Sequence, residues 1–250
     1  MKTRILITLI ATALIAFAFK KTFYNLKTPD TEEVPAVYKK IYGATSITSD
    51  GTYIYIKSKG VPDHTSPYYS TSNSLYEKFS GKTFDGSQFH QNPGTISEQN
   101  FTFRIPANPQ LNSSHPATHL GPIGIALNGV AFFNQYAGNG QPLTHEKQSF
   151  DKWWGHPTPT NDYHYHVEPL YLTTVKASKS ALLGFLLDGF PVYGPEENGK
   201  TIINTDLDAF HGHISKTEDY PDGIYHYHIT ATDPYINGSG YYGKPGSFSR

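Results

Sequence analysis

Residues 124–134 read GIALNGVAFFN, and residues 184–194 read GFLLDGFPVYG. Both stretches place an Asn-Gly or Asp-Gly pair between two short runs of apolar and aromatic residues. Such runs predict buried β-strands, and Asn-Gly or Asp-Gly is typical of a type I′ turn between two strands. We therefore expect two copies of one β-hairpin, with turns at Asn128-Gly129 and Asp188-Gly189.

The match between the two copies continues downstream. DKWWGH at 151–156 corresponds to DAFHGH at 208–213, and each is followed by Tyr-His-Tyr-His, at 163–166 and at 225–228. The order of strand, turn, Asp-x-x-x-Gly-His and Tyr-His-Tyr-His is the same in both copies, and only the loops differ in length. The sequence thus predicts an internal repeat, with units at about 119–170 and 180–232.

The rest of the chain is also typical of a β protein. GTYIYIKSKG at 51–60 and NFTFRIPANP at 100–109 alternate like strands, and 22 glycines and 18 prolines break the chain into short segments. The best helical pattern is THEKQSFDKWWG, in which Thr144 would cap a short helix and Gly155 would end it. We predict a mostly β protein, or an α+β protein with short helices, folded as one β-sandwich-like domain at 43–250 built from two pseudo-repeated units.

The first 42 residues predict a targeting segment and a linker. MKTR is a basic start, Ile5 to Phe19 is uncharged, and Ala16-Phe17-Ala18 has the small-x-small form that a signal peptidase accepts. A helix over this run would be about 22 Å long, shorter than a hydrocarbon core of about 30 Å. We predict a cleaved signal peptide at 1–18, a polar tether at 19–42, and export to the periplasm or the extracellular space. An uncleaved N-terminal membrane anchor is the alternative.

Charge and composition exclude several functions. The formal net charge is -1, from 20 basic and 21 acidic residues, and this balance offers no basic surface for nucleic acid. The chain has no cysteine, which excludes disulfides, thiolate ligands and a cysteine nucleophile. No sequence feature indicates an organic cofactor. A small molecule or an extracellular polymer stays open as a partner.

The duplicated histidines predict a metal site. Alternate side chains of a strand share one face, so the two histidines of each tetrad point the same way and can bind one ion. Neutral imidazole suits copper and zinc alike. The tetrads could lie side by side and share one site, or each unit could hold its own site together with its Gly-His element. The predicted ligands are His156, His164, His166, His213, His226 and His228.

Four further residues are candidates for the surroundings of the site. Asp151 and Asp208 precede the Gly-His elements and could fix the tautomers of the imidazoles by hydrogen bonding. Asn128 belongs to the first predicted turn and is a second-shell or pocket candidate. Tyr193 follows the second turn and could line a pocket.

The ordered set of motifs resembles the YHYH protein family, a largely uncharacterised group of exported proteins. The resemblance covers about 50–242, and its motifs are GVPDH, IGIALNGVAFFN, FDKWWGHPTPTNDYHYHVEP, LLGFLLDGFPVYGP and GIYHYHITATDPYI. It implies a fold, export and the position of a site, and it implies no particular reaction. The family often carries cysteine in its Asp-x-Cys-x-Gly-His element where this chain has Trp153 and Phe210, so a mechanism through a thiolate is not supported.

Whether the protein is an enzyme is left open by the sequence. A metal-bound water or an Asp-His pair could perform hydrolysis or oxidation on an extracellular substrate, with Asp188 as the candidate catalytic base. The Gly-x-Ser-x-Gly and His-Glu-x-x-His motifs are absent from the sequence. A third hypothesis is a non-catalytic cell-surface or carbohydrate-binding module that uses Tyr and Trp side chains.

Overall fold

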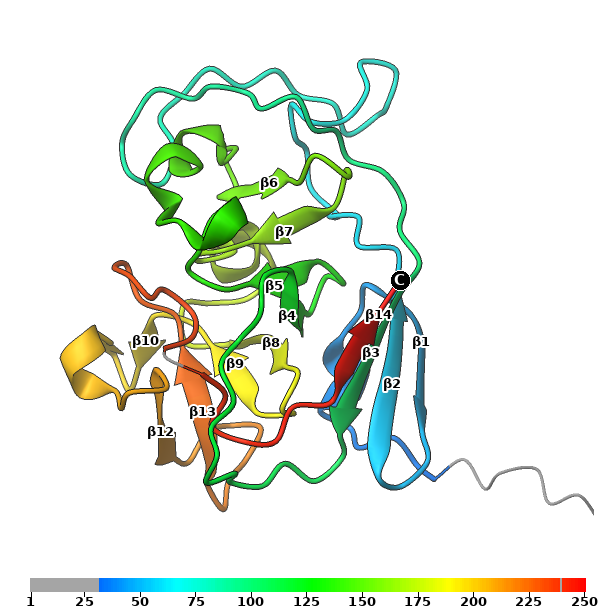
Figure 1. The fold of residues 1–250 in the computed structure, drawn as a ribbon, viewed down its shortest axis with the longest axis vertical. Helices are drawn as coiled ribbons and strands as arrows, with labels where there is room; N and C mark the ends of the chain where they lie inside the picture. The colour runs from blue at the N-terminus through cyan, green and yellow to red at the C-terminus, as the bar shows by residue number, and fades with distance from the viewer. Residues whose placement is uncertain (1–31, 239) are drawn as a thin grey trace, which may run out of the picture. The chain divides into compact units, whose positions relative to one another are not determined.

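A computed structural model describes residues 32–238 and 240–250, which form a mostly β fold of three sheets (Figure 1). The predicted signal peptide lies outside the described residues. Within these two ranges, no helix combines the length and the apolar character needed to cross a membrane. The described residues form one compact unit.

The largest sheet has eight strands, and its order is β12-β13-β9-β8-β4-β5-β7-β6. The first predicted unit supplies β4 (Pro122–Ala126), β5 (Ala131–Phe133), β6 (Gly155–Pro157) and β7 (Tyr163–Tyr165). The second unit supplies β8 (Leu182–Leu186), β9 (Pro191–Tyr193), β12 (Gly212–Ser215) and β13 (Ile224–His228). Strands formed by matching sequences therefore lie at matching distances from the middle of the sheet.

The middle of this sheet is the antiparallel pair of β4 and β8. Ile125 lies opposite Phe185, which is its counterpart in the sequence match. Gly124 lies opposite Leu186, and Ala126 opposite Gly184, so the register is the same when read from either unit. A local twofold axis perpendicular to the sheet thus passes between Ile125 and Phe185.

Both predicted hairpins form, but their turns are not of type I′. In each turn only the glycine has a positive φ, +83° at Gly129 and +86° at Gly189. The amide of Gly129 donates to the carbonyl of Ala126, and the amide of Ala126 donates to the carbonyl of Val130. This is a type I turn followed by a glycine bulge, which accommodates Asn or Asp at a negative φ.

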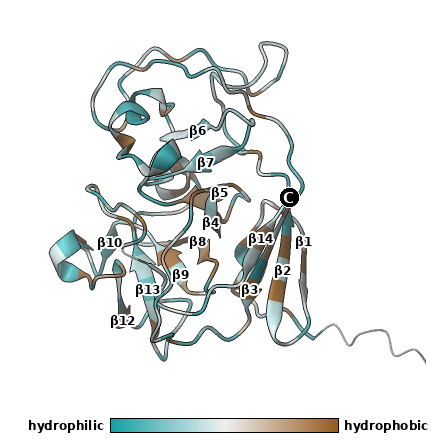
Figure 2. Ribbon diagram, in the orientation of Figure 1, coloured by the Kyte–Doolittle hydropathy of each residue, from teal (hydrophilic) through white to brown (hydrophobic). Residues whose placement is uncertain are grey.

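The second sheet contains β1 (Ala44–Ser49), β2 (Tyr53–Ser58), β3 (Phe101–Pro106) and β14 (Ser247–Ser249), in that order. Alternate residues of β2 and β3 are buried, so each strand presents one apolar face. Ile56 and Phe103 belong to the same hydrophobic core as Ile125 and Phe185 of the large sheet. Apolar residues accordingly lie on the strands of both sheets (Figure 2). The prediction of a mostly β, sandwich-like domain is confirmed.

The domain begins before residue 43, where the sequence predicted a tether. The 3-10 helix η1 (Tyr38–Lys40) places Tyr38 in the core, where its ring centroid lies 4.5 Å from that of Phe185. Ile41 is also buried. The sequence analysis missed Tyr38 and Ile41 because the charged residues of 19–42 dominate the composition of this segment. The part of the predicted tether that lies in the described residues packs on the domain from about residue 35.

The helix predicted from Thr144 to Gly155 is wrong. Two 3-10 helices, η3 (Leu143–His145) and η4 (Lys147–Ser149), occupy its first half, and no side chain caps the first of them. The Asp151 carboxylate then accepts a hydrogen bond from the backbone amide of Trp153 in a turn, and β6 begins at Gly155. The local hydrogen bond from the Trp153 amide to the Asp151 carboxylate competes with helix continuation.

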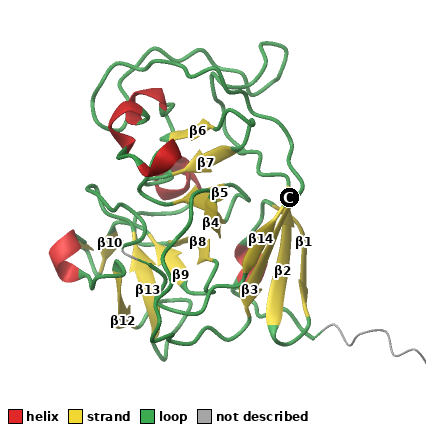
Figure 3. Cartoon of the chain, viewed as in Figure 1, coloured by secondary structure: helices red, strands yellow, loops and turns green. Residues whose placement is uncertain are grey.

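The remaining elements are short (Figure 3). They are the 3-10 helices η2 (Gly138–Gly140) and η6 (Asn204–Asp206), the π-helix η5 (Leu172–Lys176), and the two-stranded sheet of β10 (Glu196–Glu197) and β11 (Lys200–Thr201). The loop after β5 contains η2, η3 and η4, whereas the loop after β9 contains β10, β11 and η6. The two units thus share strands and differ in the connections that surround them.

Candidate metal centres

Each Tyr-His-Tyr-His tetrad contributes two histidines to one of two histidine clusters. In the pairing of β6 with β7, His156 lies opposite His164, and in the pairing of β12 with β13, His213 lies opposite His226. The Gly-His histidine of each unit therefore joins the two histidines of the adjacent tetrad strand. In each cluster the ligand atoms lie within 4.8 Å of one another. The first cluster is His156, His164 and His166, and the second is His213, His226 and His228 with Glu197.

The clusters lie near opposite ends of the large sheet (Figure 1). Four strands, β9, β8, β4 and β5, separate β13 from β7. Five strand spacings of about 4.8 Å place the two tetrad strands about 24 Å apart along the sheet. The tetrads therefore do not converge on one shared site, and of the two arrangements that the sequence left open, the structure has one cluster in each unit.

Backbone carbonyls orient the tetrad imidazoles. Nδ1 of His164 lies 3.0 Å from the carbonyl oxygen of Asp162, and Nδ1 of His166 lies 2.5 Å from that of Asn134. In the second unit, Nδ1 of His226 and His228 lie 3.0 and 2.8 Å from the carbonyl oxygens of Ile224 and Gly194. A carbonyl oxygen can only accept a hydrogen bond, so each Nδ1 must carry the proton. Each Nε2 therefore presents a free lone pair.

These lone pairs face each other in both clusters. Nε2 of His164 lies 2.9 Å from Nε2 of His166, and Nε2 of His226 lies 3.1 Å from Nε2 of His228. Two bare nitrogens at this distance repel unless a proton or a cation lies between them. Each cluster contains one more ring nitrogen, Nε2 of His156 or of His213, which is buried without a hydrogen-bond partner among the described residues.

Burial disfavours a proton in these positions. Burial lowers the pKa of His166 to about 4. The hydrogen bond to the backbone carbonyl of Asn134 acts to raise this pKa, but its effect is smaller. The pKa of His164 and His156 is well below its ordinary value for the same reason, with a further contribution from the neighbouring histidines. The pKa of His228 falls to about 4, again chiefly through burial. These four imidazoles are therefore neutral at pH 7, which is the protonation state that binds a metal.

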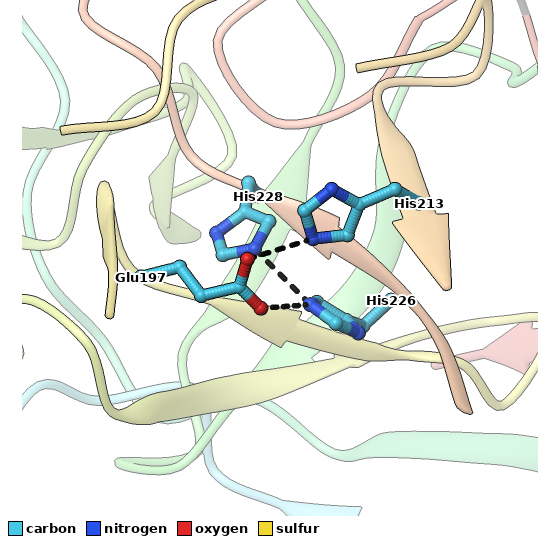
Figure 4. Close-up of side chains that lie close together, drawn as sticks. All are labelled: Glu197, His213, His226 and His228. Carbon is cyan, nitrogen blue, oxygen red and sulfur yellow. Dashed lines mark hydrogen bonds and ion pairs between the residues drawn. The ribbon is translucent and has the colours of Figure 1, made fainter. Parts of the chain in front are cut away.

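Each cluster also contacts one glutamate, which the sequence analysis missed. Oε2 of Glu146 lies 3.6 Å from Nε2 of His156 and 3.7 Å from Nε2 of His166. Oε2 of Glu197 lies 3.3 Å from Nε2 of His213, and its other oxygen lies 3.6 Å from Nε2 of His226 (Figure 4). Each unit therefore offers three imidazoles and one carboxylate.

The two glutamates lie at different places in the two units. Glu146 lies between η3 and η4, whereas Glu197 belongs to β10. Burial raises the pKa of Glu146, and the amide of Gly138 only partly offsets this. Burial also acts to raise the pKa of Glu197, but a hydrogen bond from Ser215 and the facing histidines hold it below its ordinary value. A comparison of aligned repeats could not reveal either residue, because neither has a counterpart.

Asp151 and Asp208 do not orient the imidazoles, in contrast to the prediction. The hydroxyl of Tyr163 donates to the Asp151 carboxylate at 2.9 Å, and that of Tyr225 donates to Asp208 at 2.9 Å. Tyrosines and histidines alternate along the tetrad strand, so these carboxylates face the opposite side of the sheet from the histidines. Each aspartate thus positions the tetrad strand through a tyrosine.

The predicted turn residues hold the second tyrosine of each tetrad. The side-chain amide of Asn128 donates to the hydroxyl of Tyr165 at 3.0 Å, and the hydroxyl of Tyr227 donates to Asp188 at 2.6 Å. The Asp188 carboxylate also accepts a hydrogen bond from the backbone amide of Gly243. Burial raises the pKa of Asp188 to about 6. The structure places Asp188, the candidate catalytic base, with the tyrosines and away from the histidine clusters.

A cavity opens onto each cluster. A cavity of about 500 Å³ is lined by Glu146 and by all three histidines of the first cluster. A cavity of about 650 Å³ is lined by Glu197, His226, His228 and Tyr193. Tyr193, predicted as a pocket residue, lies with its ring centroid 5.1 Å from that of His226. Both clusters are therefore accessible to a small ligand.

The fold and the clusters define a β-rich protein with a pair of possible metal centres. The sequence matches the family described as YHYH protein over residues 102–201 and 196–240, which together are more than half of the chain. The chain belongs to this family. Neither the curated proteins nor the solved structures contain a match to it.

Proposed function

We propose that this protein binds two transition-metal ions, copper or zinc, one in each histidine cluster. The observation that carries the proposal is the pair of facing Nε2 atoms in each tetrad, 2.9 Å apart in one unit and 3.1 Å apart in the other. A metal ion between them would convert a repulsive contact into two ligand bonds. Glu146 and Glu197 would each complete a set of three nitrogens and one oxygen, and would offset part of the charge of the ion.

The spacing of the two tetrad nitrogens in each cluster is compatible with copper. With a metal–nitrogen distance of about 2.1 Å, two ligands at a right angle lie about 3.0 Å apart, whereas two tetrahedral ligands lie about 3.4 Å apart. The observed 2.9 and 3.1 Å correspond to the right angle. Copper(II) prefers such tetragonal sites with nitrogen and oxygen ligands, and zinc prefers a tetrahedron.

Metal content measured on tag-free protein tests the proposal. We expect two ions per wild-type chain, and one ion in each of the variants His164→Asn and His226→Asn. His211→Asn is the matched control, because His211 is buried but hydrogen-bonds Thr230 outside both clusters. It should retain two ions. Substoichiometric metal in the wild type, together with thermal stability that a chelator does not change, would falsify the proposal.

A second candidate function is a metal-dependent extracellular hydrolase or oxidase. The cavities favour it, because each gives a small molecule access to the ligand set of a cluster. A substrate screen that compares the wild type with His164→Asn and His226→Asn tests it. Turnover that survives in the double variant would reject a role of the clusters in catalysis.

Two further parts of the proposal concern the origin and the location of the protein. The matching order of strands on both sides of the β4–β8 pair supports an internal duplication. The basic start and the uncharged run from Ile5 to Phe19 support export. N-terminal sequencing of the protein from an extracytoplasmic fraction tests the second point, and a retained Met1 would reject cleavage of a signal peptide.

A further inference from the structure

The two clusters share their histidines but differ in the residue that covers them. Phe133 ends β5 and Tyr193 ends β9, and the two are counterparts in the sequence match. The ring of Phe133 stacks on His164, with centroids 3.9 Å apart and an interplanar angle of 23°. Tyr193 instead meets His226 edge-on and hydrogen-bonds Thr217 and Asp219 through its hydroxyl. The first cluster is therefore covered by a purely apolar ring, and the second by a ring in a polar network.

The walls of the two cavities differ in the same way. Around the first cluster the wall is largely apolar, from Leu120, Phe133, Tyr136, Pro157 and Pro159. Around the second cluster the wall carries charged groups, from Lys40, Glu196, Lys216, Glu218 and Asp219. Leu120 and Tyr136 are 50% and 43% exposed, so two large apolar side chains remain accessible at the first cavity. A ligand that enters this cavity would bury them.

We propose that the first centre binds a small aromatic molecule that carries a metal-binding oxygen, and that the second centre does not share this preference. This inference rests on the proposed binding of metal. The oxygen would reach the ion at His156, His164 and His166, while the ring lies against the apolar wall. A cavity of about 500 Å³ is large enough for such a molecule. Burial of the ring and of the apolar wall supplies the selectivity.

Two hydroxamates serve as probes, because they have the same chelating group and differ in one ring. Benzohydroxamate and acetohydroxamate are titrated into copper-loaded protein, and binding is followed by calorimetry and by the visible spectrum. His226→Asn leaves the first centre for study, and His164→Asn leaves the second. At the first centre we expect benzohydroxamate to bind about 10-fold or more tightly than acetohydroxamate, and at the second centre less than about 3-fold.

Substitutions at the rim of the cavity complete the test. Leu120→Ser and Tyr136→Ser change accessible side chains and should each lower the benzohydroxamate preference of the first centre by about 3-fold or more, with the metal content unchanged. Leu111→Ser is the matched control, because Leu111 is 60% exposed and lines neither cavity. Equal preferences at the two loaded centres, or a preference that survives both rim substitutions, would overturn this inference alone. A first centre that holds no metal would overturn the proposed function as well.

Discussion

At the scale of the residue, alternate side chains of each Tyr-His-Tyr-His tetrad have two different roles. The histidines point to the cluster, and the tyrosines hydrogen-bond polar residues on the other side of the strand, Asp151 and Asn128 in the first unit and Asp208 and Asp188 in the second. This explains why the Asp-x-x-x-Gly-His element and the turn recur together with the tetrad. Each provides an anchor for one of its tyrosines.

The glutamates are predicted to be ligands rather than surface charges. Glu197→Gln removes the negative charge at the second centre and should weaken copper binding there by about tenfold or more, while the first centre is unaffected. Glu196→Gln is the control, because this neighbour faces Lys179 instead of the histidines. Calorimetric titration of each variant measures both sites. Equal effects of the two substitutions would contradict a ligand role.

Asp188 and Asn128 form a natural pair for a test of pH dependence. Burial raises the pKa of Asp188 from its ordinary 3.8 to about 6, so the folded protein binds the proton more strongly than the unfolded chain. Its contribution to stability therefore falls as pH rises from 3.8 to about 6, by roughly 3 kcal/mol. Asp188→Asn should remove this dependence.

Asn128→Asp should introduce the same dependence into the first unit, because Asn128 is buried at the matching position. Urea unfolding at several pH values between 4 and 7 measures both variants against the wild type. The decisive quantity is the change of the unfolding free energy with pH, since either substitution also alters a hydrogen bond to a tyrosine. Parallel curves for the wild type and Asp188→Asn would refute the assignment.

At the scale of the element, the turn between β4 and β5 is fixed by its glycine. Gly129 has a φ of +83°, and a Cβ at this position would lie 2.5 Å from the carbonyl oxygen of Gly43. We expect Gly129→Ala to lower the free energy of unfolding by at least about 2 kcal/mol. Gly86 has a similar φ of +78°, but a Cβ added there would meet no atom within 4 Å. Gly86→Ala should therefore cost only about 1 kcal/mol.

Chemical denaturation of both variants separates backbone strain from the steric contact. If Gly129→Ala and Gly86→Ala cost the same, the close approach of residue 43 to the turn would have no energetic weight. This contact also matters for the domain boundary. It joins the segment before β1 to the hairpin of the first unit.

The sequence predicted elements well where a local pattern determines them. Strands, hairpins and the three histidines of each cluster follow from alternation, from Asn-Gly or Asp-Gly, and from the repeat. Glu146 and Glu197 did not follow, because they reach the clusters from loops that differ between the units. The turn type was missed because Asn-Gly and Asp-Gly fit both a type I′ turn and a type I turn with a glycine bulge. The placement of the tetrads depends on strand order, which local sequence does not encode.

At the scale of the whole molecule, buried histidines make the metal-free protein sensitive to acid. Burial lowers the pKa of His64 and His211, outside the clusters, to about 4, and that of His166 and His228 within them to about 4. The unfolded chain binds these protons more strongly, so stability is retained above about pH 6.5 and is lost as pH falls toward 4. Asp151 and Asp188 act in the opposite direction between 3.8 and about 6, but they are fewer.

Thermal unfolding with and without copper measures this sensitivity. In the presence of a chelator, the midpoint should fall between pH 7 and pH 5 by several degrees, because each buried histidine that must stay neutral costs up to roughly 2 kcal/mol over this range. Bound metal competes with protons for the tetrad histidines. It should therefore shift the loss of thermal stability to lower pH. A metal-free protein with a constant midpoint over this range would refute the burial of neutral histidines.

The symmetric register of β4 and β8 has a consequence for the ancestry of the chain under the proposed duplication. An ancestor with one unit would have ended its sheet at β4, a strand whose five residues are all buried in the present protein. Such an edge exposes unpaired amides and carbonyls, and a second copy of the same strand satisfies them in the antiparallel register seen between Ile125 and Phe185. The contact between β4 and β8 in the present chain would then be the interface of a former homodimer, and fusion of its subunits would have allowed one cavity to change while the other kept its original ligand.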